Sequence, residues 1–535
     1  MSDAVTNQPP PLEGFNAYDA DPRLAEALAR AGAKSIVAPA RDLGAYVGSA
    51  DAQALAATAN RNTPRLQTHD RYGHRIDFVE YDPAYHALMA RAIGAGVHSL
   101  AWKQREAGFS SRAALFYLWN QLEQGTACPV TMTFASVPML AHAPGLDRLW
   151  RPSILADAYD PRPLPVERKT GATIGMAMTE KQGGSDLRAV QTRAQRSGEG
   201  YRLEGHKWFC SAPMSDGFFT LARLPEGVTC FFAPRSLPDG SRNAIRLQRL
   251  KDKCGNRSNA SSEIEYHGAE AVLVGEPGRG IATLIEMAHH TRFDIVVGIA
   301  GMMRAALHQA IHHARHRSAF GKPLAAQPLM ANVLADLALE SEAATLLAFR
   351  LARAFDASAL DARERELQRI LTPVAKYWVC KRMVPVAVEA MECLGGNGYV
   401  EEAPLARLYR EAPLNGIWEG SANVICLDVL RAIARSPESL AALRDEMLGV
   451  KDARIARRWA GFERALSDPA AAESQARAAV EALAVCAQAS LMVRHSPPAA
   501  ADAFCSARLG DGARSFGTLP ADSPNEKLLE RALPD

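Results

Sequence analysis

Apolar residues recur at helical spacing over most of the chain and give way to short runs in one central stretch. Segments 23–33 and 84–93 are rich in Ala and Leu three and four positions apart, the repeat of an amphipathic helix. Between roughly Thr173 and Val274, short runs bounded by Gly, Pro and Asp are typical of strands: YRLEGHKWF, GFFTLARL, GVTCFFAP, AIRLQRL and SEIEYHGAEAVLVG. Helical spacing then returns, with long segments at 293–315 and 330–355.

The order of these segments predicts the domain organisation. Helices, then strands, then helices, without alternating strand and helix units, disfavour a Rossmann fold and predict a mainly α protein with a compact central β-domain. The tail beyond Arg494 is rich in Gly, Pro and Ser, which predicts a loosely ordered end. We expect an N-terminal helical domain at 1–172, a β-domain at 173–278, a helical bundle at 279–435 and a C-terminal helical extension at 436–535.

Composition limits the partners and the compartment. The 535 residues include 61 Lys or Arg and 59 Asp or Glu, a net charge of +2, so binding to nucleic acid would need a local patch. The nine cysteines are odd in number and contain no C-x-x-C pair, which argues against a disulfide framework or a zinc site. The N-terminus has neither a basic nor an apolar signal region, and we find no apolar run of membrane-spanning length. We therefore predict a cytoplasmic protein with no membrane contact.

One glycine-rich stretch is suited to holding a planar ligand. Segment 176–186 leads from an apolar strand into Thr179, Gly183, Gly184 and Ser185. The glycines let the backbone approach a ligand closely, and the hydroxyls can hydrogen-bond to ring or phosphate oxygens. A simple turn between strands explains the same residues, so the motif is informative only together with others.

Further motifs follow along the chain. One of them contains Trp208, whose indole can stack on an aromatic heterocycle, although a tryptophan taken singly is more often part of a core. The motifs are HKWFCS at 206–211, RSAFGKPL at 317–324, LGGNGY at 394–399 and WEGSAN at 418–423.

With these motifs in this order, the chain resembles the acyl-CoA dehydrogenase superfamily of flavoproteins over about residues 125–431. The stretches 128–134, 179–186 and 250–261, together with the C-terminal extension, resemble its AidB-type alkylation-response branch. The resemblance implies a mainly α fold with a central β-barrel, a C-terminal four-helix bundle and a helical extension. It also implies a homotetramer with one FAD per subunit.

The resemblance assigns cofactor roles to the motifs. The segment with Thr179 and Ser185 would hold the flavin ring and pyrophosphate, and Trp208 would lie beside the isoalloxazine. Arg317 would bind FAD phosphate, for which a forked, permanently charged guanidinium is suited, and would meet the FAD of a neighbouring subunit. The implied cofactor-binding residues are Met178, Thr179, Gly184, Ser185, Trp208, Cys210, Ser211, Arg317, Phe320, Gly395, Gly396, Trp418, Gly420, Ser421 and Asn423.

Glu419 stands where the family commonly places its catalytic base. A carboxylate there can remove the α-proton of a thioester while the β-hydride passes to flavin, provided that burial raises its pKa. Alternatively, Glu419 only braces a turn that binds FAD. Asp294 is a second candidate for the base, one methylene shorter.

Three departures from the family pattern affect the cofactor assignment. Cys210 replaces the usual polar residue after the tryptophan, so the group that faces flavin N5 is Cys210 or its neighbour Ser211. Pro328 stands where a glutamine is common, with Gln327 one position earlier. Asn423 replaces a second glutamine, as in the AidB-type pattern.

The AidB-type branch is associated with binding to double-stranded DNA through its C-terminal extension. Here the extension carries two more acidic than basic residues, so only a local cluster would serve. On the sequence alone, a solvated helix face with internal ion pairs is the favoured explanation of that cluster, and the resemblance shifts the balance toward DNA binding. The absence of a base-reading motif predicts sequence-tolerant binding. The cluster consists of Lys451, Arg454, Arg457, Arg458 and Arg464, the first four at helical spacing on one face.

From these residues we expect an FAD-containing, AidB-like flavoprotein that binds DNA in the response to alkylation damage, with weak acyl-CoA dehydrogenase activity left open. The alternative is an acyl-CoA dehydrogenase that acts on a short branched-chain acyl-CoA, with an electron-transferring flavoprotein as oxidant and no DNA role. A flavin that is merely structural in a scaffold protein is a third interpretation.

Overall fold

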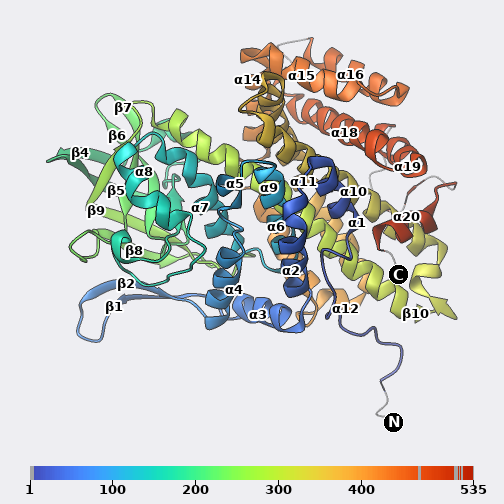
Figure 1. Ribbon diagram of the computed structural model, residues 1–535, viewed down its shortest axis with the longest axis horizontal. Coiled ribbons are helices and arrows are strands. Elements are labelled where there is room, and N and C mark those ends of the chain that lie inside the picture. Colours follow the sequence, from blue (N-terminus) through green and yellow to red (C-terminus); the bar gives the residue numbers. More distant parts are fainter. Residues whose placement is uncertain (1–4, 468–471, 511–515, 517, 520–521, 534–535) are drawn as a thin grey trace. The chain divides into compact units, whose positions relative to one another are not determined.

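The computed structural model has two compact units, one built around a sheet and one of helices (Figure 1). The boundaries of these units differ from those of the four predicted domains, because the predicted N-terminal domain contributes to both units. The four-domain division stays a prediction. The structure describes residues 5–467, 472–510, 516, 518–519 and 522–533. The helical unit comprises 1–50, 106–122 and 292–535, and the sheet unit comprises 51–105 and 123–291.

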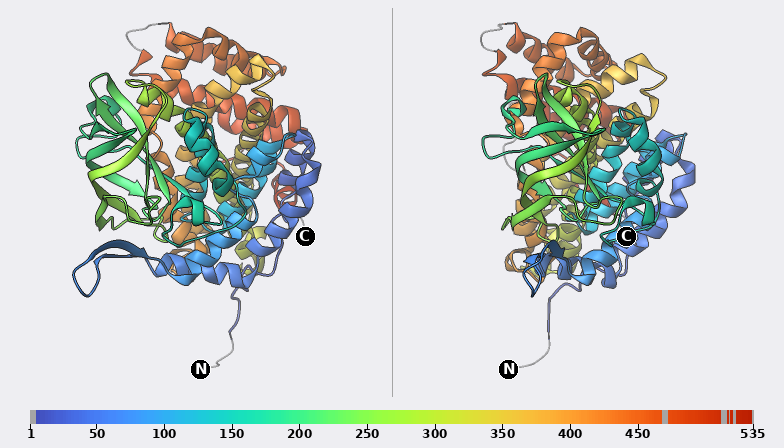
Figure 2. Two further views of the ribbon diagram at one scale, coloured as in Figure 1. Left: turned by 60° about the vertical axis from the view of Figure 1, so that its left-hand side comes forward. Right: turned by 90° about the vertical axis from the view of Figure 1, so that its left-hand side faces the viewer.

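The sheet unit contains a seven-stranded mixed sheet (Figure 2). The strand order is β3-β6-β4-β5-β9-β7, with β8 beside β9, and β6 also pairs with β7, so the pairings return to β6. The predicted central strand region is confirmed, since each predicted run coincides with one strand. The strands are β3 (Ile174–Ala177), β4 (Arg193–Ser197), β5 (Gly200–Ser211), β6 (Gly217–Leu224), β7 (Gly227–Pro234), β8 (Ile245–Leu250) and β9 (Ser261–Val274).

The hairpin of β6 and β7 shows why these runs form strands. The two strands pair antiparallel from Gly217 opposite Pro234 to Leu224 opposite Gly227. Their aromatic side chains are fully buried, so burial of large apolar groups stabilises the pair. These side chains are Phe218, Phe219, Phe231 and Phe232.

The sheet unit also holds a two-stranded hairpin that the helical pattern did not predict. Strands β1 (Arg65–His69) and β2 (Arg75–Glu80) pair antiparallel within the segment predicted to be mostly helical. The helices predicted at 84–93 and in the neighbouring segments are present. They are α3 (Ala50–Arg61), α4 (Pro83–Gly94), α5 (Leu100–Lys103), α7 (Ala127–Leu140) and α8 (Pro144–Ile154), with 3-10 turns at Val166–Arg168 and Leu187–Ala189.

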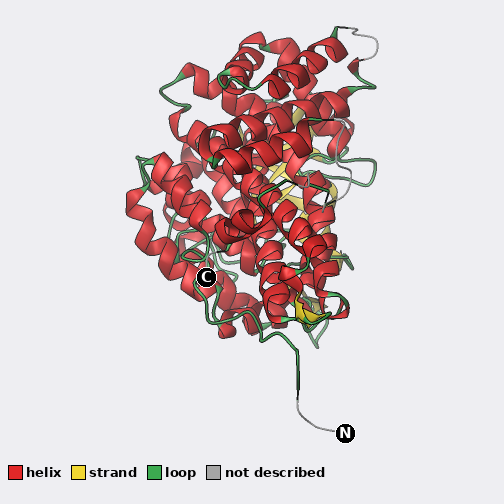
Figure 3. Cartoon of the chain, turned by 90° about the vertical axis from the view of Figure 1, so that its right-hand side faces the viewer, coloured by secondary structure: helices red, strands yellow, loops and turns green. Residues whose placement is uncertain are grey.

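The helical unit contains the long helices expected of the bundle (Figure 3). The first begins where sequence signals place a start, since Asp21 caps it, Pro22 occupies its first turn and Gly32 ends it with φ of 69°. Helix α9 starts in the sheet unit along the chain and continues in the helical one. The helices are α1 (Pro22–Ala31), α2 (Val37–Val47), α6 (Gly108–Leu122), α9 (Gly280–His316), α10 (Pro328–Ala357), α11 (Ala362–Leu394), α12 (Gly396–Tyr399), α13 (Pro404–Glu411) and α14 (Ala422–Arg435).

The C-terminal extension is joined to the bundle by buried charge. Glu446 accepts from Arg350 Nε at 2.8 Å and from Arg494 Nη1 at 2.9 Å, and despite burial these guanidinium partners lower the pKa of Glu446 to about 2. The prediction of a loosely ordered tail is wrong for two helical stretches, and other parts of that tail lie outside the described residues. The helices are α15 (Pro437–Leu448), α16 (Ala453–Leu466), α18 (Ala476–His495), α19 (Pro498–Leu509) and α20 (Asn525–Ala532).

Helix α18 is the one helix in the described part of the chain that is long and apolar enough to cross a membrane by length and composition. The sequence has no uncharged apolar run of that length here, because Arg477, Glu481 and Arg494 lie within the helix. Since 78% of its apolar window is buried inside the protein, it has the character of a core helix.

Candidate cofactor and nucleic-acid sites

Two of the predicted flavin segments lie side by side in the sheet unit. The backbone N–H of Trp208 on β5 donates to the carbonyl of Thr179, which follows β3, at 2.7 Å. A side-chain carbon added at Gly184 would lie 2.7 Å from Thr179 Oγ1, so only glycine lets the loop fold back onto Thr179. The structure therefore brings Met178, Thr179, Gly184 and Trp208 together, with Ser185 exposed on the same loop.

A buried ion pair that the sequence reasoning missed fixes this loop. Lys207 Nζ donates to Glu180 Oε1 and to the carbonyl of Leu221, both at 2.7 Å, and the Lys207 and Glu180 side chains are fully buried. Glu180 also accepts from the backbone N–H of Gln191 at 2.7 Å. Burial by itself raises the pKa of Glu180, but Lys207 and these hydrogen bonds lower it to about 2.

The Glu180 pair predicts acid lability. Because the pKa of Glu180 lies at about 2 in the folded protein, below the ordinary 4.5, the unfolded chain binds more protons as the pH falls. The stability that Glu180 contributes above pH 4.5 is expected to be lost progressively as the pH falls toward 2. Urea unfolding measured from neutral pH downward checks this, and Glu180→Gln should flatten the dependence. An equally steep loss in Glu180→Gln would assign it to other carboxylates.

Three cationic side chains lie near the indole of Trp208, and no sequence motif indicated them. Lys251 Nζ lies 3.3 Å from the centroid of the indole, and Lys181 and Arg249 each lie 5.7 Å from it. Lys251 is also paired with Glu263 at 2.5 Å. An ammonium this close to an indole face is a cation–π contact, so the region around Trp208 favours an electron-rich or anionic ligand.

The side chain of Cys210 is not exposed to a ligand. It is 1% exposed, and burial raises the pKa of its thiol to about 12. The neighbouring Ser211 is half-buried, and its Oγ lies 3.3 Å from Ser261 Oγ. Of the two groups predicted to face flavin N5, the structure leaves Ser211 as the accessible one.

In the helical unit, Arg317 begins a small hairpin. Strands β10 (Ser318–Ala319) and β11 (Lys322–Pro323) flank Phe320, which is 96% exposed with φ of 51°. Gln327 Nε2 donates to the carbonyl of Ala319 at 2.8 Å. The glutamine that stands one position early therefore supports the hairpin, and Pro328 starts α10 where its missing N–H costs nothing.

The glycine turn after α11 is open to an approaching ligand. Gly395 has φ of 60°, which favours glycine, and side-chain carbons added at Gly395 or Gly396 would touch nothing within 4 Å. Gly398 differs, since an added carbon would lie 2.4 Å from the carbonyl of Met391. Gly395 and Gly396 thus expose backbone, whereas Gly398 serves packing.

Two cationic side chains hold the turn that carries Glu419. Lys376 Nζ donates to the carbonyls of Trp418 at 3.0 Å and Gly420 at 2.6 Å, and Arg292 Nε donates to that of Glu419 at 2.9 Å. Glu419 has φ of 55°, a costly conformation that persists only when its surroundings fix it. Lys376 is 1% exposed. The sequence motifs indicated neither residue, and a lysine within the apolar run ILTPVAKYWVC was the available signal.

The second candidate for the base is wrong. Asp294 is fully buried and forms a two-point ion pair with Arg112 of α6, with Arg112 Nη2 2.7 Å from Asp294 Oδ2. Both carboxylate oxygens face a guanidinium, so Asp294 is a structural partner and not an available base.

Asn423, the last residue of the WEGSAN motif, contacts the C-terminal extension. Asn423 Oδ1 accepts from Arg477 Nε at 2.8 Å, and Arg477 lies on α18. Ser421 precedes α14 as its N-cap residue. The predicted cofactor motif and the C-terminal extension are therefore joined directly.

The basic cluster of the extension does not form one free face. Arg454 pairs with Asp452 and Asp502, each at 2.7 Å, and Arg458 lies 3.5 Å from Glu481. Lys451 precedes α16 and is not part of the predicted helix face. The exposed members are Lys451, Arg457 and Arg464, which make no ion pair with the part of the chain that the structure describes.

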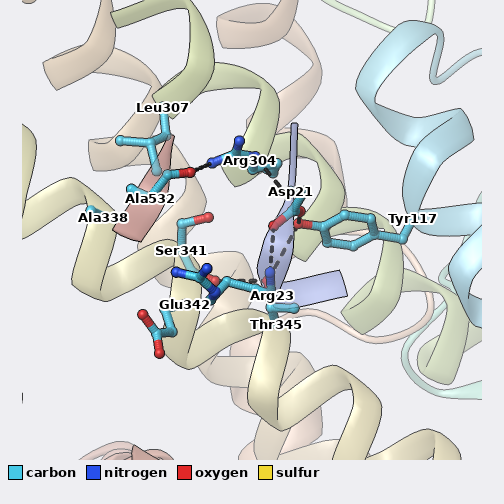
Figure 4. A pocket seen from close by; sticks show the side chains of 10 residues that line it. All are labelled: Asp21, Arg23, Tyr117, Arg304, Leu307, Ala338, Ser341, Glu342, Thr345 and Ala532. Atoms are coloured by element: carbon cyan, nitrogen blue, oxygen red, sulfur yellow. Dashed lines mark hydrogen bonds and ion pairs between the residues drawn. The ribbon is translucent and has the colours of Figure 1, made fainter. Parts of the chain in front are cut away.

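Residues that line a pocket in the helical unit hold α20 in place (Figure 4). Tyr117 Oη donates to Asp21 Oδ2 at 2.6 Å, and Arg304 Nη1 donates to the carbonyl of Ala532 at 2.5 Å. None of the predicted site residues lines it. Its lining consists of Asp21, Arg23, Tyr117, Arg304, Leu307, Ala338, Ser341, Glu342, Thr345 and Ala532.

Comparisons with known proteins define the class. Residues 175–269 match the acyl-CoA dehydrogenase middle domain and residues 278–434 the acyl-CoA dehydrogenase C-terminal domain, while residues 7–161 match the adaptive response protein AidB N-terminal domain. The chain belongs to the acyl-CoA dehydrogenase family of FAD-binding flavoproteins. Within it, the chain is 46% identical to AidB of Escherichia coli (strain K12) over 513 residues, 94% of each chain, which places it in the AidB branch.

Other relatives agree with this branch. The chain is 31% identical to acyl-CoA dehydrogenase family member 11 of Caenorhabditis elegans, over 80% of this chain and 72% of that one. The structure of C. elegans ACDH-11 in complex with C11-CoA has a TM-score of 0.84 at 26% identity, covering 100% and 93% of the two chains. The Bd2924 apo-form has a TM-score of 0.85 at 27% identity, covering 91% and 99%.

The residues present fit FAD. The glycine turn exposes backbone at Gly395 and Gly396, Arg317 supplies a guanidinium, and the Thr179 loop lies against Trp208. Bound FAD supplies a hydride acceptor. Thr179 and Trp208 would hold its ring system. Arg317 and the glycine turn would contact the FAD of a neighbouring subunit, with Arg317 at a phosphate.

Proposed function

We propose that this protein is an AidB-type FAD flavoprotein that binds double-stranded DNA in the cytoplasm as part of the response to alkylation damage. The observation that carries the proposal is the 46% identity with AidB over 94% of both chains, a coverage that includes most of the C-terminal extension. The family model named for the adaptive response protein AidB adds support over residues 7–161.

The geometry favours a reduced DNA-binding surface on the extension. Arg457 and Arg464 lie seven residues apart on α16, hence on one face, and both are exposed, as is Lys451 before the helix. Arg454 and Arg458 are engaged by carboxylates of α19 and α18. Phosphate contacts would therefore come from Lys451, Arg457 and Arg464, and binding would tolerate any sequence.

Charge reversal tests this surface. We expect Arg457→Glu with Arg464→Glu to weaken duplex DNA binding at least about tenfold and to reduce the slope of log K against log salt by about 2 for each bound chain, since each phosphate contact contributes roughly 0.9. Fluorescence anisotropy with a labelled duplex over a salt series measures both quantities.

The matched control is Arg454→Gln with Arg458→Gln, which removes the same number of cations from the ion-paired side of α16. It should leave the salt slope unchanged. An unchanged slope in the reversal variant would remove this surface from the DNA-binding account.

A homotetramer is part of the proposal. Large apolar side chains in the helical unit are exposed to solvent: Phe320 by 96%, Leu329 by 83% and Tyr399 by 79%. Such exposure in a folded chain favours burial against another copy. Sedimentation of the FAD-loaded protein measures the state.

Acyl-CoA dehydrogenation is the second candidate function. It is favoured by the clamped Glu419 turn, which presents a carboxylate on a fixed backbone. A short branched-chain acyl-CoA would be the substrate, and an electron-transferring flavoprotein would reoxidise the cofactor.

A further inference from the structure

The residues before α1 run along the C-terminal part of α9. The ring of Phe15 lies edge-on to His308 with centroids 4.6 Å apart, the carbonyl of Pro10 lies 2.8 Å from His312 Nε2, and Asn7 bonds to Ser318 just after the helix. Segment 7–15 therefore follows α9 in the opposite direction and ends at the hairpin that begins with Arg317.

Asn7 makes a specific contact with this hairpin. Its Oδ1 accepts from the Ser318 backbone N–H at 2.8 Å, and its Nδ2 donates to the Ser318 carbonyl at 2.8 Å. Arg317 Nη1 donates to the backbone carbonyl of Asn7 at 2.5 Å. Asn7 has φ of 56°, a region that asparagine enters more readily than most residues. The three bonds fix both the hairpin backbone and the guanidinium that starts it.

Gln8 extends the contact to the glycine turn. Its Oε1 accepts from Asn397 Nδ2 at 3.1 Å. Asn397 directly follows Gly395 and Gly396, whose backbone is open. Two adjacent residues of one segment thus join the two separate parts of the helical unit that carry Arg317 and the glycine turn.

The Arg317 hairpin needs such anchoring. The hairpin has strands of only two residues, and its tip residue Phe320 is 96% exposed. Two such short strands with little packing are not stable by themselves. When a ligand binds donors that are mobile, ordering those donors reduces the free energy gained on binding. Donors that are already fixed avoid this cost.

We propose that Asn7 and Gln8 are positioning residues for FAD, holding the Arg317 hairpin and the glycine turn in the arrangement that meets the FAD of a neighbouring subunit. The proposal rests on the assignment of Arg317, Gly395 and Gly396 to FAD. The segment acts through these groups, and its side chains need not touch the cofactor.

The test replaces Asn7 with glycine, which keeps the positive φ and removes the amide. Hydrogen exchange of the flavin-free protein should be faster at the Ser318 amide, because its acceptor is gone. FAD titrated into flavin-free protein should bind about three- to thirtyfold more weakly, as expected for the loss of one or two hydrogen bonds. Thr6→Ala, an exposed neighbour, is the matched control and should change neither quantity.

The outcomes separate this proposal from the assignment beneath it. Faster exchange at Ser318 together with weaker FAD binding supports the positioning role. Unchanged exchange, or FAD that binds Asn7→Gly as tightly as or more tightly than the wild type, overturns it. If Arg317→Ala binds FAD like the wild type, the assignment of Arg317 to FAD fails, and the positioning proposal fails with it.

Discussion

Glu419→Gln is expected to slow reduction of the flavin by an acyl-CoA about 10²- to 10⁴-fold, the range that a positioned general base contributes. The amide keeps the size of the side chain but cannot take the α-proton. The turn should stay intact, because Lys376 and Arg292 hold it through the carbonyls of Trp418, Glu419 and Gly420, none of which the substitution changes. Anaerobic bleaching of the visible flavin band with short branched-chain acyl-CoAs measures the rate.

One control separates chemistry from binding. FAD affinity of Glu419→Gln should equal that of the wild type, since the carboxylate is assigned to the substrate. A variant that bleaches at the wild-type rate would leave Glu419 with a bracing role only. A wild type that no acyl-CoA reduces would reject dehydrogenation as a function, with the DNA-binding proposal unaffected.

Lys207→Met is expected to destabilise the protein by about 3–5 kcal/mol, the usual cost of leaving one member of a buried ion pair without its partner. Glu180 would stay in the interior with its main cation removed, and the carbonyl of Leu221 would lose its donor. Because Glu180 also holds the loop after Thr179, FAD affinity should fall as well. Urea unfolding followed by circular dichroism gives the stability, and FAD titration gives the affinity.

The double variant Glu180→Gln with Lys207→Met provides the decisive comparison. Removing both charges leaves no isolated buried ion, so the double variant should be more stable than Lys207→Met alone. Lys181 directly follows Glu180 and is exposed, so Lys181→Met should change the free energy of unfolding by no more than about 0.5 kcal/mol. A double variant less stable than Lys207→Met would contradict the assignment of the effect to the pair.

The sequence predicts the sheet well because its strands are bounded by strong local signals. The runs at β6 and β7 coincide with the strands to the residue, since glycine opens each run and a turn separates them. The hairpin at Arg65–Glu80 was missed because its strands are short and polar, with three of the five residues of β1 exposed. Such strands carry neither helical nor alternating apolar periodicity.

Long-range pairing explains the rest of what the sequence did not predict. Spacing along one helix puts Arg454 and Arg458 on a basic face, but their partners Asp502 and Glu481 come from other helices. In the same way, Lys376 and Arg292 reach the Glu419 turn from different helices. A motif names the residue that does the chemistry, whereas the residues that hold it in place are set by tertiary contacts.

We propose that the Thr179 loop, Trp208, Arg317 and the glycine turn of this chain bind FAD. Titration of FAD into flavin-free protein, followed by flavin absorbance and fluorescence, tests it most directly. We expect a yellow protein with one FAD per chain and at least about tenfold weaker binding in Arg317→Ala, the effect of losing a charge-assisted hydrogen bond. A protein that stays colourless when FAD is added would contradict it.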